Sequence, residues 1–353
     1  MRKGKRLIAW IMAVVMLFTI CVFGGNGTAE AAATTPVAKH GRLSVKGADL
    51  VDSKGNKFQL RGISTHGINW DVGSPYVNKK AFKTLRDDWG VNAIRLAMYT
   101  EEYNGYCSGG SQAKLRKQVD KGVGYATDLG MYAIIDWHIL SDGNPNKNKS
   151  QAKKFFTAMA KKYKNNKNVI YEICNEPNGC SWKEIKSYAT DIIKTIRKYD
   201  KKAVIIVGTP TWSQLGTDGT SNEVADSPIK GYKNIMYSLH FYASEWAHNE
   251  YLPAKVAYAR KKKLPIIVSE FGLSPASGDG AINKASADKW MKLLNKYNIS
   301  YFCWSLSNKN ESASLLKPST KKTSGWKSGD LSTAGKYIKK KYLARKKALG
   351  KKA

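Results

Sequence analysis

Residues 168–177, NVIYEICNEP, decide the fold class of this chain. The run begins with apolar, β-branched and aromatic residues, the composition of a strand that is buried on both faces. Pro177 has no N–H to donate to a sheet ladder, so the strand must end before it. Glu176 is therefore predicted at the carboxyl end of a buried strand, which is the end of a parallel barrel where the chemistry takes place.

Residues 264–272, LPIIVSEFG, have the same design: an apolar run, then Glu270, then a glycine that interrupts the pattern. Two carboxyl groups at strand ends are what cleavage of a glycosidic bond requires. One protonates the leaving oxygen and the other meets the anomeric carbon. Either glutamate alone could simply end its strand in solvent, but the two together favour a catalytic pair.

Strand and helix signals alternate along the rest of the chain, which predicts eight β-then-α units closing into a (β/α)8 TIM barrel. Short strands at 43–45, 49–51 and 57–60, with a turn at 53–56, predict a small N-terminal β-hairpin that closes the barrel floor. The barrel strands are expected at 58–64, 91–98, 131–137, 168–176, 203–208, 234–241, 265–270 and 300–306. The helices are expected at 79–89, 114–129, 150–164, 182–199, 222–225, 253–263, 284–297 and 334–347.

The first segment has the basic, apolar and small-residue order of a secretory signal peptide. Basic residues precede an apolar run over 7–23, and small residues near Ala31 and Ala33 offer cleavage sites. The alternative is an uncleaved membrane anchor, because the apolar run is long. We therefore expect a secreted, extracellular protein with a signal peptide at 1–31, a flexible leader at 32–40, a catalytic domain at 41–345 and a basic tail at 346–353.

The formal charge of the chain is +32, and +29 remains once residues 1–31 are removed. A charge of this size favours contact with polyanions. No nucleic-acid-binding motif is present, so we interpret the lysines mainly as solvated helix faces, with adhesion to anionic cell-wall polymers as the alternative.

Cys107 and Cys180 fall in predicted loops and could pair, whereas Cys174 and Cys303 fall in strands. No cysteine spacing is typical of a zinc site.

Polar and aromatic residues gather at the ends of the predicted strands. Each of them has a structural alternative, since a strand-end histidine often only donates a hydrogen bond and an arginine can neutralise a buried carboxylate. A metal site built from the histidines is less favoured, because no His-x-His pair ends the first strand and the glutamate pair already supplies the chemistry. The residues are His66, Arg95, His138, His240, Tyr242 and Trp304.

With these residues in place, the chain resembles glycoside hydrolase family five, and among its members the secreted bacterial endo-β-1,4-glucanases. The motifs that carry the resemblance are GISTHG at 62–67, LRDDWG at 85–90, IDWHILSDGNPN at 135–146, VIYEICNEPN at 169–178 and HFY at 240–242. They recur in order, strand after strand, over residues 36–345.

The resemblance implies a role for each residue and no cofactor or metal. Glu176 would be the general acid/base and Glu270 the nucleophile of a retaining mechanism. Arg95 and Tyr242 would bind the nucleophile, Asn175 the sugar 2-hydroxyl, and His240 would contact Glu176. His66 and His138 would line the glycone side and Trp304 would stack under a sugar. Further substrate contacts would come from Trp70, Tyr99 and Trp212 in loops, and from Lys309 and Glu311 beyond the cleavage point.

The expected partner is a β-glucan polysaccharide, bound by a monomer without nucleic acid. Many relatives have Trp after the nucleophile where this chain has Phe271, which leaves the subsites open. The first functional hypothesis is hydrolysis of internal bonds in cellulose. The alternatives are the same chemistry on mannan, xyloglucan or mixed-linkage glucan, and a catalytically inactive carbohydrate-binding barrel.

Overall fold

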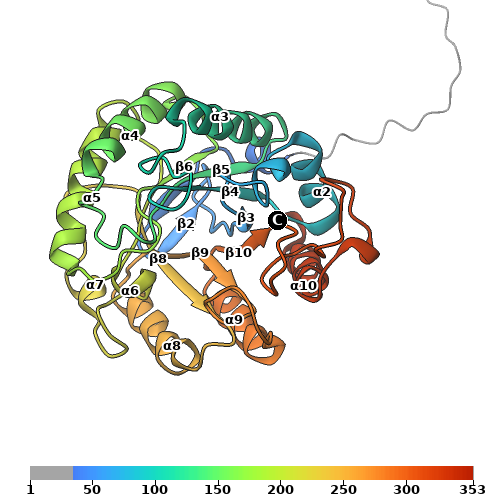
Figure 1. Ribbon diagram of the computed structural model, residues 1–353. Coiled ribbons are helices and arrows are strands. Elements are labelled where there is room, and N and C mark those ends of the chain that lie inside the picture. The colour runs from blue at the N-terminus through green and yellow to red at the C-terminus, as the bar shows by residue number, and fades with distance from the viewer. Residues whose placement is uncertain (1–34, 353) are drawn as a thin grey trace, which may run out of the picture. The chain divides into compact units, whose positions relative to one another are not determined.

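The computed structural model describes residues 35–352, and these form a closed barrel of eight parallel strands (Figure 1). The strands follow one another around the barrel in chain order, and β10 pairs with β3 to close it. The predicted fold class is therefore confirmed. The strands are β3 Arg61–Thr65, β4 Ala93–Tyr99, β5 Tyr132–His138, β6 Val169–Glu172, β7 Ile205–Val207, β8 Ile235–Tyr242, β9 Ile266–Gly272 and β10 Tyr301–Leu306.

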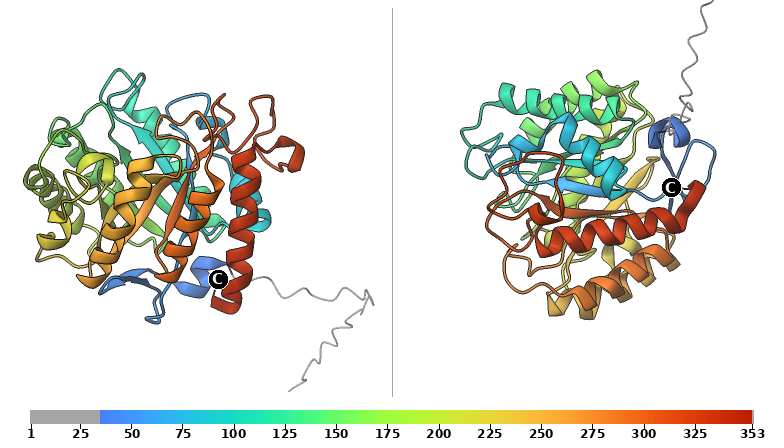
Figure 2. Two further views of the ribbon diagram at one scale, coloured as in Figure 1. Left: turned by 90° about the horizontal axis from the view of Figure 1, so that it is seen from below. Right: turned by 90° about the vertical axis from the view of Figure 1, so that its right-hand side faces the viewer.

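Helices surround the barrel and cover the outer faces of its strands (Figures 1 and 2). Within residues 35–352 no helix has the length and apolar character needed to cross a membrane. The α-helices are α1 Pro36–His40, α2 Lys79–Trp89, α3 Gln112–Asp128, α4 Lys149–Tyr163, α5 Trp182–Arg197, α6 Pro210–Ser213, α7 Glu223–Asp226, α8 Trp246–Lys261, α9 Lys284–Lys296 and α10 Thr333–Leu349. Three 3₁₀ turns are η1 Ser74–Tyr76, η2 Ser328–Asp330 and η3 Gly350–Lys352.

The predicted hairpin is present as β1 Ser44–Lys46 and β2 Asp49–Val51, an antiparallel pair. It lies at the amino-terminal end of the barrel, below the strands in the left view of Figure 2. Its apolar side chains and Phe58 pack against residues from seven barrel strands that point into the barrel. The cluster is Leu43, Leu50, Phe58, Leu60, Ala93, Tyr132, Ile134, Ile170, Val204, Ile206, Met236, Ile267 and Phe302. The N-terminal segment therefore closes the barrel floor with apolar contacts.

Two of the predicted segment boundaries are wrong where the structure describes them. The flexible leader expected at 32–40 is instead helical over Pro36–His40, with Thr35 as its N-cap and Val37 N bonded to Gly130 O at 2.9 Å. The basic tail expected from residue 346 continues α10 to Leu349.

The predicted signal peptide at 1–31 lies outside the described residues. Among those that are described, Cys107, Cys174, Cys180 and Cys303 are free thiols, so the Cys107–Cys180 bond does not form.

Replacing Phe58 with Ala should destabilise the fold, because Phe58 is only 1% exposed and packs on the rings of His40 and Tyr132. Removing a buried phenylalanine ring typically costs about 3–5 kcal/mol. Denaturant unfolding measures the change, and Tyr103→Ala is the control, since that side chain is 80% exposed. Equal unfolding free energies for the two variants would show that Phe58 does not contribute to the core at the barrel floor.

Candidate active site

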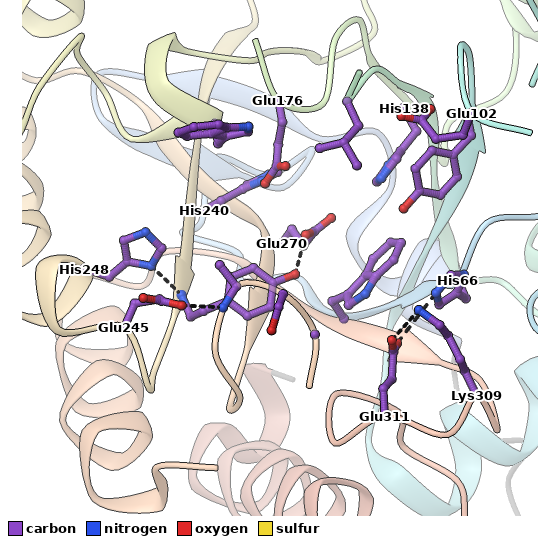
Figure 3. Close-up of a pocket in the computed structure, with 18 of the residues that line it drawn as sticks. His66, Glu102, His138, Glu176, His240, Glu245, His248, Glu270, Lys309 and Glu311 are labelled. Atoms are coloured by element: carbon purple, nitrogen blue, oxygen red, sulfur yellow. Dashed lines mark hydrogen bonds and ion pairs between the residues drawn. The ribbon is translucent and has the colours of Figure 1, made fainter. Parts of the chain in front are cut away.

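A cleft opens at the carboxyl ends of the barrel strands, and it brings together twelve of the fourteen predicted site residues (Figure 3). The other two, Arg95 and Asn175, are fully buried and hydrogen-bonded to one another. Side chains from several separate strands and loops thus converge on one site. The twelve are His66, Trp70, Tyr99, His138, Glu176, Trp212, His240, Tyr242, Glu270, Trp304, Lys309 and Glu311.

Glu270 is held by two donors at the end of β9. The Tyr242 hydroxyl donates to its Oε1 at 2.7 Å, and Arg95 Nη1 donates to its Oε2 at 2.9 Å. A cation and a hydroxyl donor both stabilise a charged carboxylate. Gly272 allows this arrangement, because a Cβ at that position would lie 2.5 Å from the Tyr242 ring. The predicted contacts of Arg95 and Tyr242 are therefore present.

Glu176 lies in the segment that follows β6, four residues beyond the last strand residue, and faces a different neighbour. His240 Nδ1 is 2.8 Å from Glu176 Oε1, and His240 Nε2 is 2.9 Å from Ser269 Oγ. Burial lowers the pKa of His240 to about 4, so this imidazole is neutral. A neutral imidazole carries one N–H, so the His240 ring donates to one of these two partners and accepts from the other.

Burial also raises the pKa of Glu176, to about 8. The positive charge of Arg95 lowers this pKa by less than burial raises it. The carboxyl is therefore protonated at neutral pH. Its Oε1 lies beside the His240 ring in the cleft (Figure 3). One carboxyl of the pair is thus poised to give up a proton, while its partner is held by a guanidinium.

The two carboxyl groups are close to one another. One oxygen of Glu176, one oxygen of Glu270 and a ring nitrogen of His240 all lie within 4.8 Å of one another. In the described part of the chain, these three residues are the group that could hold a metal ion. The Arg95 guanidinium, already bonded to Glu270, opposes a second cation there.

Arg95 lies beneath the cleft and contacts three carboxylates at once. Its nitrogens are 3.0 Å from Asp136, 2.7 Å from Glu172 and 2.9 Å from Glu270. The carboxylates raise the pKa of Arg95 despite its complete burial, so it stays charged. Burial raises the pKa of Asp136 to about 7 and also raises that of Glu172, because one cation cannot compensate three buried anions.

Aromatic rings form one wall of the cleft. The His138 ring is stacked on Trp304 at a centroid separation of 5.3 Å, and Tyr99 lies 4.4 Å from Trp70. His66 is 5.0 Å from Trp304. Asp136 Oδ2 accepts from His138 Nδ1 at 2.6 Å and fixes the ring orientation. Flat apolar faces combined with hydrogen-bonding edges suit the binding of sugar rings.

Lys309 and Glu311 lie on this same wall. Lys309 Nζ is 2.5 Å from Glu311 Oε2, and His66 Nε2 is 3.6 Å from Glu311 Oε1 (Figure 3). Both residues therefore line the cleft beside His66. Their place beyond the cleavage point stays a prediction.

Trp212 faces the cleft on a short turn rather than on a regular helix. Thr211, Trp212 and Ser213 all have left-handed backbone angles, and Trp212 is 44% exposed. Trp212 N bonds to Pro177 O and Ser213 Oγ bonds to Asn175 O. These bonds tie the turn to the segment that carries Glu176.

Asn175 donates to Ile139 O and accepts from Arg95. Its predicted contact with a sugar hydroxyl stays a prediction.

Sequence reasoning missed several residues of the site. Asp136 and Glu172 are charged residues inside apolar strands, at positions that share a face with His138 and with Ile170. The available signal was a charged residue within an apolar strand, because a charge buried inside a barrel needs a partner. Four further cleft residues lie in loops or at a helix start, where no periodic pattern marks them. They are Glu102, Gln214, Glu245 and His248.

Three comparisons with known proteins agree with this geometry. Residues 51–310 match the family described as cellulase (glycosyl hydrolase family 5). The chain is 47% identical to an endoglucanase of Clostridium saccharobutylicum over 95% of this chain and 72% of that protein. It is 44% identical to endoglucanase 5 of Pectobacterium carotovorum subsp. carotovorum over 92% of this chain, but it spans only 62% of that longer protein.

Solved structures give the same answer for the fold and the family. The catalytic domain of an endoglucanase from Thermobifida fusca superposes with a TM-score of 0.82 at 37% identity, covering 88% of this chain and 99% of that domain. A crystal structure of the same domain contains cellotetraose. A β-glucanase from Saccharophagus degradans, 22% identical with a TM-score of 0.69, shares the fold.

The protonation of Glu176 can be measured directly. In carbon-13 NMR of protein with labelled glutamate carboxyls, we expect one carboxyl to titrate near pH 8, because burial disfavours its charged form. That signal should be missing from Glu176→Gln and present in Glu101→Gln. A spectrum in which every glutamate titrates below pH 6 would contradict the assignment.

Proposed function

Because the chain belongs to the cellulases of glycosyl hydrolase family 5, we propose that it is a secreted endo-β-1,4-glucanase that cuts internal bonds of cellulose with net retention. The observation that carries the proposal is the carboxyl pair, with oxygens of Glu176 and Glu270 within 4.8 Å. Retaining glycosidases hold their carboxyls ~5–5.5 Å apart, while inverting enzymes leave ~6.5–9.5 Å for a water. The short spacing supports direct attack by Glu270.

The first step transfers the sugar to the enzyme. A Glu270 oxygen attacks the anomeric carbon, and the bond to the leaving oxygen breaks as that oxygen takes the proton of Glu176. Arg95 and Tyr242 keep their hydrogen bonds to Glu270 and position its oxygens. The Glu176 pKa of about 8 supplies the protonated acid at neutral pH and should set the basic limb of the kcat/KM profile.

The second step reverses the roles of the carboxyls. The Glu176 carboxylate removes a proton from a water, whose oxygen attacks the anomeric carbon and releases Glu270. Glu176 is then protonated again and Glu270 is again a carboxylate. Two displacements at one carbon restore the original configuration.

Two alternatives from the sequence remain to be distinguished from cellulose hydrolysis. Mannan, xyloglucan and mixed-linkage glucan would use the same carboxyl pair, so initial rates on each polymer must be compared with carboxymethylcellulose. An inactive binding barrel would have no need of a protonated Glu176 opposite a guanidinium-bound Glu270. A fall in the viscosity of carboxymethylcellulose is therefore the first test of the proposed activity.

Secretion is supported by the order of the first residues, basic and then apolar and then small. The bond after Ala31 or Ala33 is the expected cleavage site. Protein recovered from the culture medium should begin after one of these residues, and exported protein that still begins at Met1 would contradict the proposal.

The stereochemical course tests the mechanism. Proton NMR of a cello-oligosaccharide digest should show the β-anomer of the first product before mutarotation, because two displacements retain configuration. Glu176→Ala should lower kcat on cello-oligosaccharides about 10²–10⁴-fold, the usual contribution of a general acid. Activated aryl glycosides do not need that proton, so they should still form the intermediate.

Azide separates the two carboxyls in the same assay. With Glu270→Ala, azide should occupy the place of the missing carboxylate and yield the α-glycosyl azide. With Glu176→Ala, azide should attack the glycosyl-enzyme and yield the β-glycosyl azide. The α-anomer as first product of the parent enzyme, or the reverse pattern of azides, would overturn the assignment of roles.

Glu102 should contribute to binding on the aromatic wall. Its Oε1 accepts from Ser141 N at 2.9 Å, while its buried Oε2 has no hydrogen-bond partner in the described chain. A hydrogen bond from a sugar hydroxyl to a charged oxygen contributes about 1.5–3 kcal/mol. Glu102→Gln should therefore raise KM for long cello-oligosaccharides at least ~10-fold, with little change in kcat.

Glu101→Gln is the matched control for Glu102, because the Glu101 carboxylate binds Lys147 and Asn148 rather than lining the cleft. Short aryl cellobiosides provide a second comparison, since they fill fewer sugar positions. Equal KM values for the Glu102→Gln enzyme and its parent on the longest oligosaccharide would exclude this contact.

A further inference from the structure

Two adjoining hollows lie on the outside of the barrel, away from the cleft. The first lies between α4 and α5, and the second lies at the floor, where the loops after these helices meet residues 41–53. Both are lined by Tyr199, so they form one continuous feature, which we call the basic trough. Its cationic residues are Lys153, Lys154, Lys194 and Lys198 in the first hollow and Arg42, Lys164, Lys167, Lys201 and Lys202 in the second.

The lysines of the basic trough are exposed, and none of the eight forms an ion pair within the described chain. Only two carboxylates line the trough, and both already have a cationic neighbour. Asp191 is 3.1 Å from Lys149, and Asp200 is 3.9 Å from Arg42. Arg42 also lines the second hollow, and its Nη1 is buried without a hydrogen-bond partner in the described chain.

Like charges gathered in this way repel one another and destabilise the compact state unless counterions or a polyanion compensate them. We propose that the basic trough binds a linear, phosphate-rich anionic polymer, with phosphates placed along α4–α5 and at the floor. Each bound phosphate releases condensed counterions and neutralises lysines that the protein itself leaves uncompensated. This proposal does not depend on the identity of the glucan that the cleft cuts.

The trough fits a phosphodiester polymer without bases better than a nucleic acid. Proteins that bind single-stranded nucleic acid combine a basic groove with aromatic rings on which bases stack. Tyr199 is the one aromatic residue lining the trough, and Lys161 Nζ lies over its ring at 5.1 Å. The trough therefore offers charge and hydroxyl groups, as from Thr157 and Thr195, but no free stacking surface.

The trough and the cleft do not compete for space. The cleft opens at the carboxyl ends of the strands, whereas the trough runs along the outer side of α4 and α5 to the barrel floor, on the left of Figure 1. None of the residues that line the trough lines the cleft. One molecule can therefore hold an anionic polymer and a neutral glucan chain at the same time.

The test measures binding of the full chain to a purified glycerol phosphate polymer as salt is varied. The variant is the triple substitution Lys194→Gln, Lys198→Gln and Lys202→Gln, which removes charge but keeps long polar side chains. Loss of three phosphate contacts should reduce the slope of log K against log salt by about 2 and weaken binding roughly 100-fold at about 0.1 M salt.

The matched control removes the same charge from α9, on another side of the barrel, through Lys284→Gln, Lys289→Gln and Lys292→Gln. Both triple variants should hydrolyse a soluble substrate at the parental rate. If both triple variants bind the polymer equally weakly, net charge alone causes binding, and the proposed site in the basic trough is wrong. If the protein binds a single-stranded oligodeoxythymidylate more tightly than the phosphate polymer, the ligand of the basic trough is a nucleic acid and the proposal is wrong.

Discussion

The site depends on one buried cation. Arg95 is fully buried on β4, and its guanidinium bonds to carboxylates from β5, β6 and β9. Removing one partner from such a group leaves an uncompensated buried charge, which typically costs about 3–5 kcal/mol. Four strands of the barrel are therefore held in register at the level of the cleft by one side chain, and the position of Glu270 follows from that register.

This arrangement also gives the two cleft glutamates different neighbours. Glu270 bonds to the guanidinium and to a tyrosine hydroxyl, whereas Glu176 bonds to an imidazole that burial keeps neutral. Burial then raises the pKa of Glu176 to about 8. Two identical side chains a few ångströms apart thus lie in different environments, which is what the proposed division into an acid and a nucleophile requires.

The sequence predicted the parts of the site that follow from strand periodicity. Apolar runs that end in a glutamate and a breaker located Glu176, which follows the fourth barrel strand, and Glu270, which lies near the carboxyl end of the seventh. Glu172 was missed because it lies within the same apolar run, where the pattern predicts a strand and does not mark a site residue. The helical leader at Pro36–His40 was missed because its bond to Gly130 is a tertiary contact, which local pattern does not contain.

Charge is distributed unevenly between the cleft and the outside of the barrel. The carboxyl groups of Glu102, Glu245 and Glu311 join those of Glu176 and Glu270 in lining the cleft, and the one lysine that lines it is Lys309. An uncharged glucan gains nothing from long-range attraction, so the lysines on α4 and α5 cannot serve to steer it. The proposed anionic partner accounts for a cationic surface that is separate from an acidic cleft, and the physical separation of the two would let each partner be bound without displacing the other.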